Sequence, residues 1–567
     1  MISWQQVIDA ENGKGTLPDN AVLLSFDDGY ETMYNVVFPL LKAYNYPAVF
    51  APVTGWLDTP ADQKIAYADK MLDRSVFATW SQVKEMEQSG LVEIASHTHN
   101  LHNGINANPS GGQLPSVIAP EYKNGKYETE DAYKNRLKSD FTRTVQTLVN
   151  HIGKKPRVMV WPYGQFNDVA VQIARQAGMP HYFSLGEKIV NKVGDKHIGR
   201  LLLNAETDLN TVKNYLDGID ESKQIQRVLH VDLDYVYDAD KAQQAKNLDK
   251  LIDRIYRYGV TTVYLQAFSD PDGDGVADAL YFPNKYLPVR DDIFGRIAWQ
   301  LQTRAGVQVY AWMPVLAFDL RKGVKEAEYV IDSRTGKPST KAYLRLSPYN
   351  KQNVEIIKSI YNDLSFHAKF NGILFHDDAF LTDFEGAEGN HAEGMVSPQA
   401  KQKTQDLIQL THQLTDALKP YFLRGSYSLK TARNLYASVI TNPNAEEWLA
   451  QNLKTLTDNY DTTAIMAMPY MENEQPISQK EAYQWFASLI ENVKAQAPLE
   501  KVLFEFQAVN WRTQKPIPES ELIDWMTLLQ KNHIYSYGYY PDNFLTNQPD
   551  MNKMKPYFSV NTNAGKQ

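Results

Sequence analysis

The 567-residue sequence predicts an α/β protein of two domains, the second of which is a (β/α)8 barrel. The length exceeds what a single compact core commonly holds. Short apolar, β-rich runs alternate with amphipathic stretches along the chain. Beyond a polar break near residues 217–226, eight strand-like runs follow one another, and eight is the strand number of this barrel.

The composition narrows the class of partner. Net charge is −9 and no long run of Lys or Arg occurs, which argues against nucleic acid. Aromatic residues reach 12%, with 34 Tyr and 10 Trp, a composition that suits stacking on sugar rings. The sequence contains no Cys, so a metal would be held by His, Asp or Glu. Carbohydrate is therefore the first substrate class that we consider.

The beginning of the sequence has neither the basic nor the apolar segment of a signal peptide. No stretch of 18 apolar residues follows. As written, the chain is expected to be soluble and to carry no targeting segment.

The first domain is expected to span residues 1–220 and to be a β/α domain. Its predicted strands are 21–26, 48–53, 91–95, 157–161 and 201–203. The stretch 217–226 is polar and loses periodicity, as linkers do.

The second domain is expected to span residues 226–560. Its eight predicted strands are 228–234, 262–268, 307–312, 372–377, 423–428, 464–468, 502–507 and 534–539, of which the fifth is the weakest. In such barrels the active site is built from the loops after the strands.

Two adjacent carboxylates, Asp27 and Asp28, end an apolar run in the first domain, and Gly29 permits a sharp turn there. One carboxylate could bind a metal while the other acts as general base. The alternative is that the pair caps a helix that begins near Tyr30.

Three histidines, His97, His99 and His102, follow another apolar strand. Neutral imidazole is the commonest metal ligand, although a lone His is more often structural. On an extended segment His97 and His99 share a face, whereas His97 and His102 converge only across a turn. Spacing alone therefore leaves the ligand pair open.

A third strand ends in the turn Trp161-Pro162-Tyr163-Gly164. A free backbone N–H in this turn could face an oxyanion. The alternative is an ordinary strand followed by a turn.

In this order, the Asp-Asp, paired-His and Pro-Tyr motifs resemble those of the polysaccharide deacetylases, the family 4 carbohydrate esterases. The residues of these motifs are similar to those of the poly-β-1,6-N-acetyl-D-glucosamine deacetylases of the PgaB type. These enzymes take part in biofilm exopolysaccharide export. The resemblance implies a distorted β/α barrel for the first domain. It also implies Asp27 as the base, and Asp28, His97 and His102 as ligands of one divalent metal, which could be zinc, nickel, cobalt or iron. The backbone N–H of Tyr163 would stabilise the oxyanion.

The sequence departs from the wider esterase pattern in two places, both of which the PgaB type tolerates. The motif histidines lie five apart rather than four, and Arg157 lies five residues before Pro162 rather than two. The PgaB type also has an upstream segment with a signal, a lipid-attached Cys and a Tyr-His-Asp whose His is the general acid. That segment has no counterpart here. We therefore expect a trimmed chain with weak deacetylation, and a periplasmic, outer-membrane lipoprotein at full length.

Several carboxylates lie near the predicted strand ends of the barrel. A buried carboxylate needs a partner or a function. Glycoside hydrolysis generally needs an acid and a second carboxylate or a group on the substrate. The candidates are Asp383, Asp377, Asp378 and Glu505 for catalysis, with Asp232 buried and Asp234 as a substrate-binding group. We expect Asp383 to be the acid; the alternatives are that it caps the next helix or binds sugar amines.

Four aromatic residues near predicted strand ends are candidates for sugar stacking, although each alone is more often part of a core. They are Trp312, Trp511, Tyr539 and Tyr540. The segment from Asp270 to Gly275 imitates a calcium loop, but Tyr281 stands where such a loop needs an acid. A rigid loop is the preferred interpretation.

The resemblance continues through the barrel, in phrases such as His230-Val-Asp-Leu-Asp and His376-Asp-Asp-Ala. It implies that the barrel binds and cleaves the partly deacetylated β-1,6-linked polymer, and that an outer-membrane export porin is a partner. One alternative is a non-catalytic binding module that guides polymer to an export pore. Another is a peptidoglycan or chitin deacetylase, which does not explain the second domain.

Overall fold

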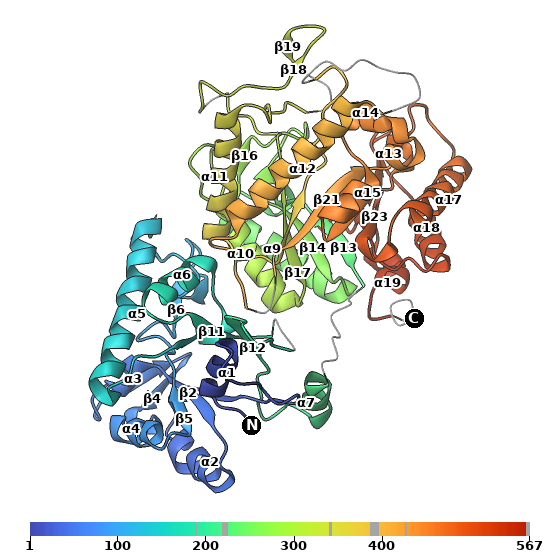
Figure 1. Cartoon of the computed structure of the whole chain (residues 1–567). Coiled ribbons are helices and arrows are strands. Elements are labelled where there is room, and N and C mark those ends of the chain that lie inside the picture. Colours follow the sequence, from blue (N-terminus) through green and yellow to red (C-terminus); the bar gives the residue numbers. More distant parts are fainter. Residues whose placement is uncertain are drawn as a thin grey trace. The chain divides into compact units, whose positions relative to one another are not determined.

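The computed structural model describes residues 1–186, 190–217, 225–321, 323–339, 343–385, 396–425 and 428–562. The chain forms two compact units (Figure 1). The first is Met1–Ser222 with Pro420–Ser428, and the second is Lys223–Lys419 with Leu429–Gln567. Residues 218–224, which make up most of the predicted linker, lie outside the described residues.

The first unit is built on two three-stranded parallel sheets. Their strands, in spatial order, are β1 (Leu24–Asp28), β2 (Ala48–Pro52) and β5 (Val92–Ile94), then β10 (Val158–Val160), β11 (His181–Leu185) and β12 (His197–Arg200). A parallel bridge between Ser96 and Met159 connects the two sheets. This arrangement is the irregular β/α barrel expected for the first domain.

The last strand of this unit comes earlier in the sequence than predicted. The predicted strand 201–203 is wrong, because β12 ends at Arg200 and the side chains of Leu202 and Leu203 are exposed. A run of leucines at the surface imitated a buried strand.

The described residues of the first unit form seven α-helices, most of which lie around the sheets (Figure 1). They are α1 (Trp4–Glu11), α2 (Phe38–Tyr44), α3 (Thr54–Leu57), α4 (Trp80–Gln88), α5 (Glu130–Ile152), α6 (Asp168–Gln176) and α7 (Leu209–Leu216). Helix α5 begins where the Thr129 side chain accepts from the backbone N–H of Ala132, and it ends at Gly153, whose φ is 79°.

Short antiparallel strand pairs lie in the loops of the first unit. They are β3 (Lys64–Tyr67) with β4 (Lys70–Asp73), β6 (Gly104–Asn106) with β7 (Gln113–Pro115), and β8 (Tyr122–Lys123) with β9 (Lys126–Tyr127). The first unit also contains a short π-helix, η1 (Met33–Val37), and two 3-10 helices, η2 (Arg74–Val76) and η3 (Pro162–Gly164).

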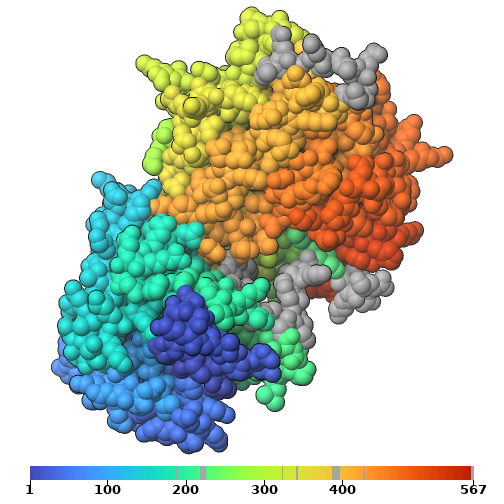
Figure 2. All heavy atoms as spheres, viewed as in Figure 1, coloured from blue at the N-terminus to red at the C-terminus, as the bar shows by residue number. Residues whose placement is uncertain are grey.

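The core of the first unit lies on both faces of its sheets. Strand β2 alternates, since Phe50 packs with the cluster that includes Phe77 and Met86, while Val49 packs with the cluster that includes Trp4 and Phe183. Both faces are therefore covered, as parallel sheets require. In the space-filling view, the dark blue atoms of the first residues lie on the face shown (Figure 2).

The second unit is a closed parallel barrel, which confirms the predicted (β/α)8 architecture. Its strands follow one another in sequence order around the barrel. They are β13 (Arg227–Val231), β14 (Thr262–Gln266), β17 (Gln308–Met313), β20 (Gly372–Phe375), β21 (Lys430–Tyr436), β22 (Thr462–Met466), β23 (Val502–Gln507) and β26 (Tyr537–Tyr540).

The longer helices of the second unit cover the outside of the barrel, and short helices lie in the loops after its strands (Figure 1). They are α8 (Leu233–Val236), α9 (Lys241–Tyr258), α10 (Phe294–Gln300), α11 (Lys351–His367), α12 (Pro398–Leu418), α13 (Ser438–Thr441), α14 (Glu446–Leu449), α15 (Leu453–Asn459), α16 (Pro469–Glu472), α17 (Gln479–Gln496), α18 (Glu519–Lys531) and α19 (Met551–Phe558). Among the helices that the structure describes in either unit, none has the length and apolar character needed to cross a membrane.

Smaller elements lie in the loops of the barrel. Three are antiparallel pairs: β15 (Phe268–Ser269) with β16 (Ala279–Leu280), β18 (Ile331–Asp332) with β19 (Lys337–Pro338), and β24 (Val509–Asn510) with β25 (Lys515–Pro516). The others are the short π-helix η4 (Leu301–Ala305) and the 3-10 helices η5 (Pro443–Ala445) and η6 (Leu499–Lys501).

The fifth barrel strand is where the prediction was wrong. The predicted strand 423–428, of which 426–427 lie outside the described residues, precedes the real strand β21. Strand β21 carries Arg433 and Asn434, whose side chains are buried and bonded, Arg433 to Ala379 O and Asn434 to Glu505. Because these polar residues interrupt the apolar pattern, the strand did not appear as one in the sequence.

Candidate functional sites

Three predicted ligands meet at the mouth of the first unit. Asp28 Oδ1 lies 3.3 Å from His97 Nε2 and 3.2 Å from His102 Nε2. One donor atom from each residue falls within 4.8 Å of the others. One carboxylate and two imidazoles form a donor set that suits a divalent transition metal with an open position. The residues present therefore fit the metal that the motifs imply.

The backbone brings Asp28 and His97 into this geometry. Asp28 ends β1 with a φ of 72°, and Gly29 follows with a φ of 99°. A Cβ at Gly29 would meet the Pro52 side chain at 3.0 Å, so the close approach of β2 also requires glycine. His97 Nδ1 lies 2.7 Å from the carbonyl oxygen of Val160, which fixes the proton there and leaves Nε2 as the ligand atom.

His99 is turned away from the other two histidines. Its Nδ1 lies 3.0 Å from Thr54 Oγ1. Asp140, from α5, accepts the backbone N–H groups of His99 and Asn100 at 2.8 and 2.7 Å and so fixes the loop between the two ligands. Burial raises the pKa of Asp140 to about 6, against the lowering effect of these two hydrogen bonds. The structure thus selects His97 and His102 from the alternatives that spacing left open.

Asp27 has a partner that the sequence did not reveal. Arg200, the last residue of β12, donates from Nη1 and Nη2 to the two carboxylate oxygens of Asp27, each at 2.8 Å. Burial alone would raise the pKa of Asp27, but the charge and hydrogen bonds of Arg200 outweigh it and hold the pKa below its usual value. Asp27 is therefore ionised at neutral pH, as a proton acceptor must be.

The arginine noted in the sequence has another role. Arg157 pairs with both oxygens of Glu93, at 3.0 and 2.9 Å. Arg200 ends β12, which belongs to a different sheet from β1, so no local pattern in the sequence could have indicated its pair with Asp27.

Tyr163 lies beside the metal ligands. It occupies the turn η3 with a φ of 58°, and its ring centroid is 4.5 Å from that of His102. Such a left-handed conformation is costly for a residue other than glycine and is frequent at functional sites. The oxyanion role of its backbone N–H stays a prediction.

A cavity of about 810 Å³ occupies the barrel of the second unit. Most of the predicted barrel residues line it: Asp232, Asp234, Trp312, Asp377, Glu505, Trp511 and Tyr540. Its volume is in the range of small-molecule sites. Loop carboxylates Asp270, Asp272 and Asp274 also contribute to the lining.

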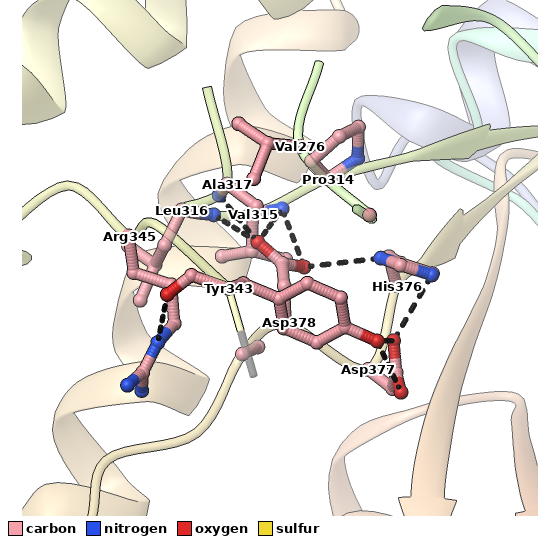
Figure 3. Close-up of polar contacts among 12 residues, drawn as sticks. Val276, Pro314, Val315, Leu316, Ala317, Tyr343, Arg345, His376, Asp377 and Asp378 are labelled. Carbon is pink, nitrogen blue, oxygen red and sulfur yellow. Dashed lines mark hydrogen bonds and ion pairs between the residues drawn. The ribbon is translucent and has the colours of Figure 1, made fainter. Parts of the chain in front are cut away.

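Asp377 is held by a network on one wall of this cavity (Figure 3). Tyr343 donates to both of its oxygens at 3.0 Å, Tyr436 donates to Oδ2 at 2.8 Å, and His376 Nε2 lies 3.0 Å from Oδ1. Burial would raise the pKa of Asp377, but the charge of His376 and these bonds hold it below the usual value. Asp377 is therefore an anion in the cavity wall.

Asp378 points the other way (Figure 3). It is fully buried, and its carboxylate accepts the backbone N–H groups of Val315, Leu316 and Ala317. Because these amides occupy it and it does not line the cavity, the predicted catalytic role of Asp378 is not supported. It fixes the loop after β17 instead.

Asp232 and Asp234 differ in their surroundings. Asp232 is buried, and its Oδ1 has no hydrogen-bond partner among the described residues, while Tyr540 lies 3.4 Å from Oδ2. Burial and the charge of Asp234 raise the pKa of Asp232 to about 7. Asp234 accepts from Arg290, Tyr281 and the backbone N–H of Asp270. Asp232 Oδ1 can therefore accept a hydrogen bond from a ligand, whereas the Asp234 carboxylate holds the loop that contains Asp270.

Glu505 lines the cavity and is 1% exposed. His230 Nε2 is 2.7 Å from Oε1, and Asn434 donates to Oε2 at 2.8 Å. Asp383 lies past β20, partly exposed, and is not among the residues that line the cavity. The structure therefore does not bring Asp383 together with Asp377 and Glu505.

The prediction that Tyr539 stacks on sugar rings is wrong. Its ring is fully buried, and its hydroxyl donates to Asp542 at 2.7 Å. Side chains alternate along a strand, so Tyr540 lines the cavity whereas Tyr539 packs outside the barrel, against Phe558.

The segment that imitates a calcium loop is internally bonded. Asp270 accepts the backbone N–H groups of Gly273, Asp274 and Gly275. These bonds agree with the rigid loop that the sequence predicts, and Asp270, Asp272 and Asp274 also bring donor atoms within 4.8 Å of one another.

Comparisons with known proteins agree with this two-part arrangement. A model described as "Polysaccharide deacetylase" matches residues 14–182, and one described as "Hypothetical glycosyl hydrolase family 13" matches residues 230–540. Over 99% of its length the chain is 40% identical to the poly-β-1,6-N-acetyl-D-glucosamine N-deacetylase of Escherichia coli (strain K12), of which the alignment covers 86%.

Two solved structures are also similar. The PgaB (BpsB) glycoside hydrolase domain of Bordetella bronchiseptica is 39% identical with a TM-score of 0.55, and the match covers 60% of this chain and all of that one. A de-N-acetylase of Aggregatibacter actinomycetemcomitans is 66% identical over 38% of this chain and 82% of its own, with a TM-score of 0.37. The chain therefore belongs to the poly-β-1,6-N-acetyl-D-glucosamine N-deacetylase family, with a polysaccharide deacetylase domain followed by a glycoside hydrolase-like barrel.

Proposed function

We propose that the first unit is a metal-dependent N-deacetylase of poly-β-1,6-N-acetyl-D-glucosamine. The observation that carries this proposal is the convergence of Asp28, His97 and His102 beside an Asp27 that Arg200 keeps ionised. The substrate is the one named for the E. coli relative. Chitin or peptidoglycan deacetylation would use the same chemistry but gives the barrel no role.

The chemistry of the first unit follows from the positions of its groups. A bound divalent cation would polarise the acetamide carbonyl and acidify a water molecule. Asp27 accepts the proton of that water, and the backbone N–H of Tyr163 donates to the oxygen that becomes negative. The water oxygen joins the carbonyl carbon, the C–N bond breaks, and the leaving nitrogen takes the proton that Asp27 accepted. Acetate and a glucosamine unit result.

We further propose that the barrel binds and cleaves the partly deacetylated polymer. Its cavity combines the aromatic rings of Trp511 and Tyr540 with the carboxylates of Asp232 and Asp377. Deacetylated sugars carry ammonium groups, which bind carboxylates through charge-assisted hydrogen bonds. The match to a glycosyl hydrolase model over residues 230–540 supports cleavage. Asp383 stays the proposed acid, and Asp377 is the anion that lines the cavity.

A second candidate function is a barrel that binds polymer without cutting it. It is favoured by the position of Asp383 outside the lining and by Glu505, whose two oxygens are both occupied. In that case the barrel would guide polymer towards an export porin. The porin partner and the periplasmic, outer-membrane location stay predictions from the family resemblance.

One experiment tests both units. The chain is incubated with fully acetylated and with partly deacetylated β-1,6-linked oligomers, and the products are analysed by mass spectrometry. Loss of acetyl groups reports on the first unit, and shorter products report on the barrel. The His102→Ala variant should lose only deacetylation, and Asp383→Asn only cleavage. Unchanged oligomer length on every substrate would favour the binding module.

A further inference from the structure

We propose that Tyr67 is a positioning residue of the metal centre, which holds Asp28 so that a single carboxylate oxygen faces the cation. Tyr67 belongs to the hairpin β3–β4, a segment that carries none of the three sequence motifs. The inference rests on the metal-binding part of the proposed function.

The two oxygens of Asp28 have different partners. Tyr67 donates its hydroxyl hydrogen to Oδ2, at 2.9 Å. The other oxygen, Oδ1, is the atom that lies 3.3 Å from His97 Nε2 and 3.2 Å from His102 Nε2. Oδ1 therefore points to the place where the ligand atoms converge, and Oδ2 is occupied by the hydroxyl group.

The ring of Tyr67 also supports a second ligand. It lies nearly parallel to the His102 ring, with centroids 6.0 Å apart and 20° between the planes. Trp56 packs against both rings, with centroids 5.5 Å from Tyr67 and 5.1 Å from His102. Tyr67 thus acts on two of the three metal ligands at once.

The hairpin is anchored to the core, so it can hold Tyr67 in place. Strand β3 pairs Ile65 with Leu72 and Tyr67 with Lys70. Residues two apart share a face, and Ile65, on the face of Tyr67, is 4% exposed within the core that includes Phe77. Burial of Ile65 therefore directs Tyr67 towards the metal ligands.

The consequence concerns coordination. The hydrogen bond from Tyr67 holds Oδ2 towards the hairpin, which favours binding of the metal through Oδ1 alone. With that bond kept, the protein supplies three ligand atoms and leaves positions open for water and substrate, as catalytic sites require. Removal of a group that orients a metal ligand in this way commonly weakens metal binding about tenfold to a hundredfold.

The test uses Tyr67→Phe, which keeps the ring and removes only the hydroxyl. The matched control is Tyr34→Phe, because Tyr34 also donates to a carboxylate, Glu85 Oε2 at 2.6 Å, which is not one of the three ligands. Co²⁺ is added to metal-free protein, affinity is measured by competition with a chelator, and the visible absorption of the bound Co²⁺ is recorded. Circular dichroism and the thermal midpoint check that both variants fold.

The expected result is Co²⁺ binding about tenfold to a hundredfold weaker in Tyr67→Phe, with the Tyr34→Phe value equal to wild type. The Co²⁺ absorption of Tyr67→Phe should also be weaker, since a freed Oδ2 raises the coordination number. Wild-type affinity and spectrum in Tyr67→Phe would overturn the proposal. If instead the wild-type chain binds no Co²⁺, or His102→Ala binds it equally well, the metal centre itself is wrong.

Discussion

Arg200 and Asp27 form a two-point ion pair, in which Nη1 and Nη2 of the arginine each lie 2.8 Å from one oxygen of the carboxylate. The two residues are 173 positions apart and come from β12 and β1. A bidentate pair fixes orientation as well as charge. The proton acceptor of the proposed deacetylation is therefore held by a residue outside all three motifs.

Replacing Arg200 with Met should shift the acid side of the deacetylation profile to higher pH. Arg200 lowers the pKa of Asp27, so its loss lets burial raise that pKa, and the base becomes protonated at higher pH. Below the new pKa, kcat/KM should fall about tenfold per pH unit. The matched control is Arg157→Met, which removes the pair with Glu93 and should leave the profile in place. Identical profiles for both variants would rule out this role.

His102→Ala should remove the bound metal, whereas His99→Ala should retain it. His102 Nε2 lies 3.2 Å from Asp28 Oδ1, but His99 is directed to Thr54. Elemental analysis of purified protein should show about one divalent ion per chain in wild type and His99→Ala, and almost none in His102→Ala. Equal metal in His102→Ala and wild type would refute this ligand set.

Asp383→Asn should abolish cleavage of partly deacetylated polymer while polymer binding persists. The amide keeps the size of the side chain but cannot donate the acid proton, a contribution typically worth about a hundredfold to ten-thousandfold. Cleavage is measured by the length of the products, and binding by the retention of polymer. Full cleavage by Asp383→Asn would transfer the acid to Asp377, Asp232 or Glu505, which line the cavity.

Asp378→Asn should destabilise the barrel. An asparagine presents one acceptor oxygen and an N–H2 group to three backbone N–H donors, so a buried donor loses its partner. The expected loss is about 2–4 kcal/mol of unfolding free energy, measured by urea denaturation followed through tryptophan fluorescence. Asp383→Asn, on a partly exposed residue, serves as the stability control. A stability equal to wild type would show that these hydrogen bonds contribute little.

Asp232→Asn should stabilise the barrel more at pH 8 than at pH 5. The folded pKa of about 7 lies above the unfolded value, so the stability that Asp232 contributes is complete below the unfolded value and is lost as the pH rises through about 7. Asparagine has no such pH dependence. Thermal midpoints of variant and wild type at both pH values provide the measurement. A larger gain at pH 5 would contradict the raised pKa.

The regular parts of the fold were predictable from local pattern. Seven of the eight barrel strands coincided with apolar runs, whereas β21 did not, because Arg433 and Asn434 find their partners only inside the closed barrel. Residues close in sequence, such as His97 and His102, could be grouped as candidate ligands. Arg200 and Tyr67 could not, since their contacts depend on strand ends and on a hairpin far from the motifs.

Adjacent residues also show where sequence reasoning stops. Asp377 and Asp378 are neighbours of the same type, and one lines the cavity while the other is buried among backbone amides. Likewise Tyr540 lines the cavity and Tyr539 does not. Alternation along β26 predicts that Tyr539 and Tyr540 differ, whereas Asp377 and Asp378 lie in the turn after β20, where this rule does not apply.

Asp378 binds only the main-chain N–H groups of Val315, Leu316 and Ala317. These hydrogen bonds therefore do not depend on which side chains the three residues carry. Many side chains of suitable size could replace these three without loss of the contact. Proline is the exception, since it has no N–H to donate. The side chains of these three residues are themselves fully buried, so apolar replacements of similar size would keep the path of the loop, and with it the wall beside His376 and Asp377.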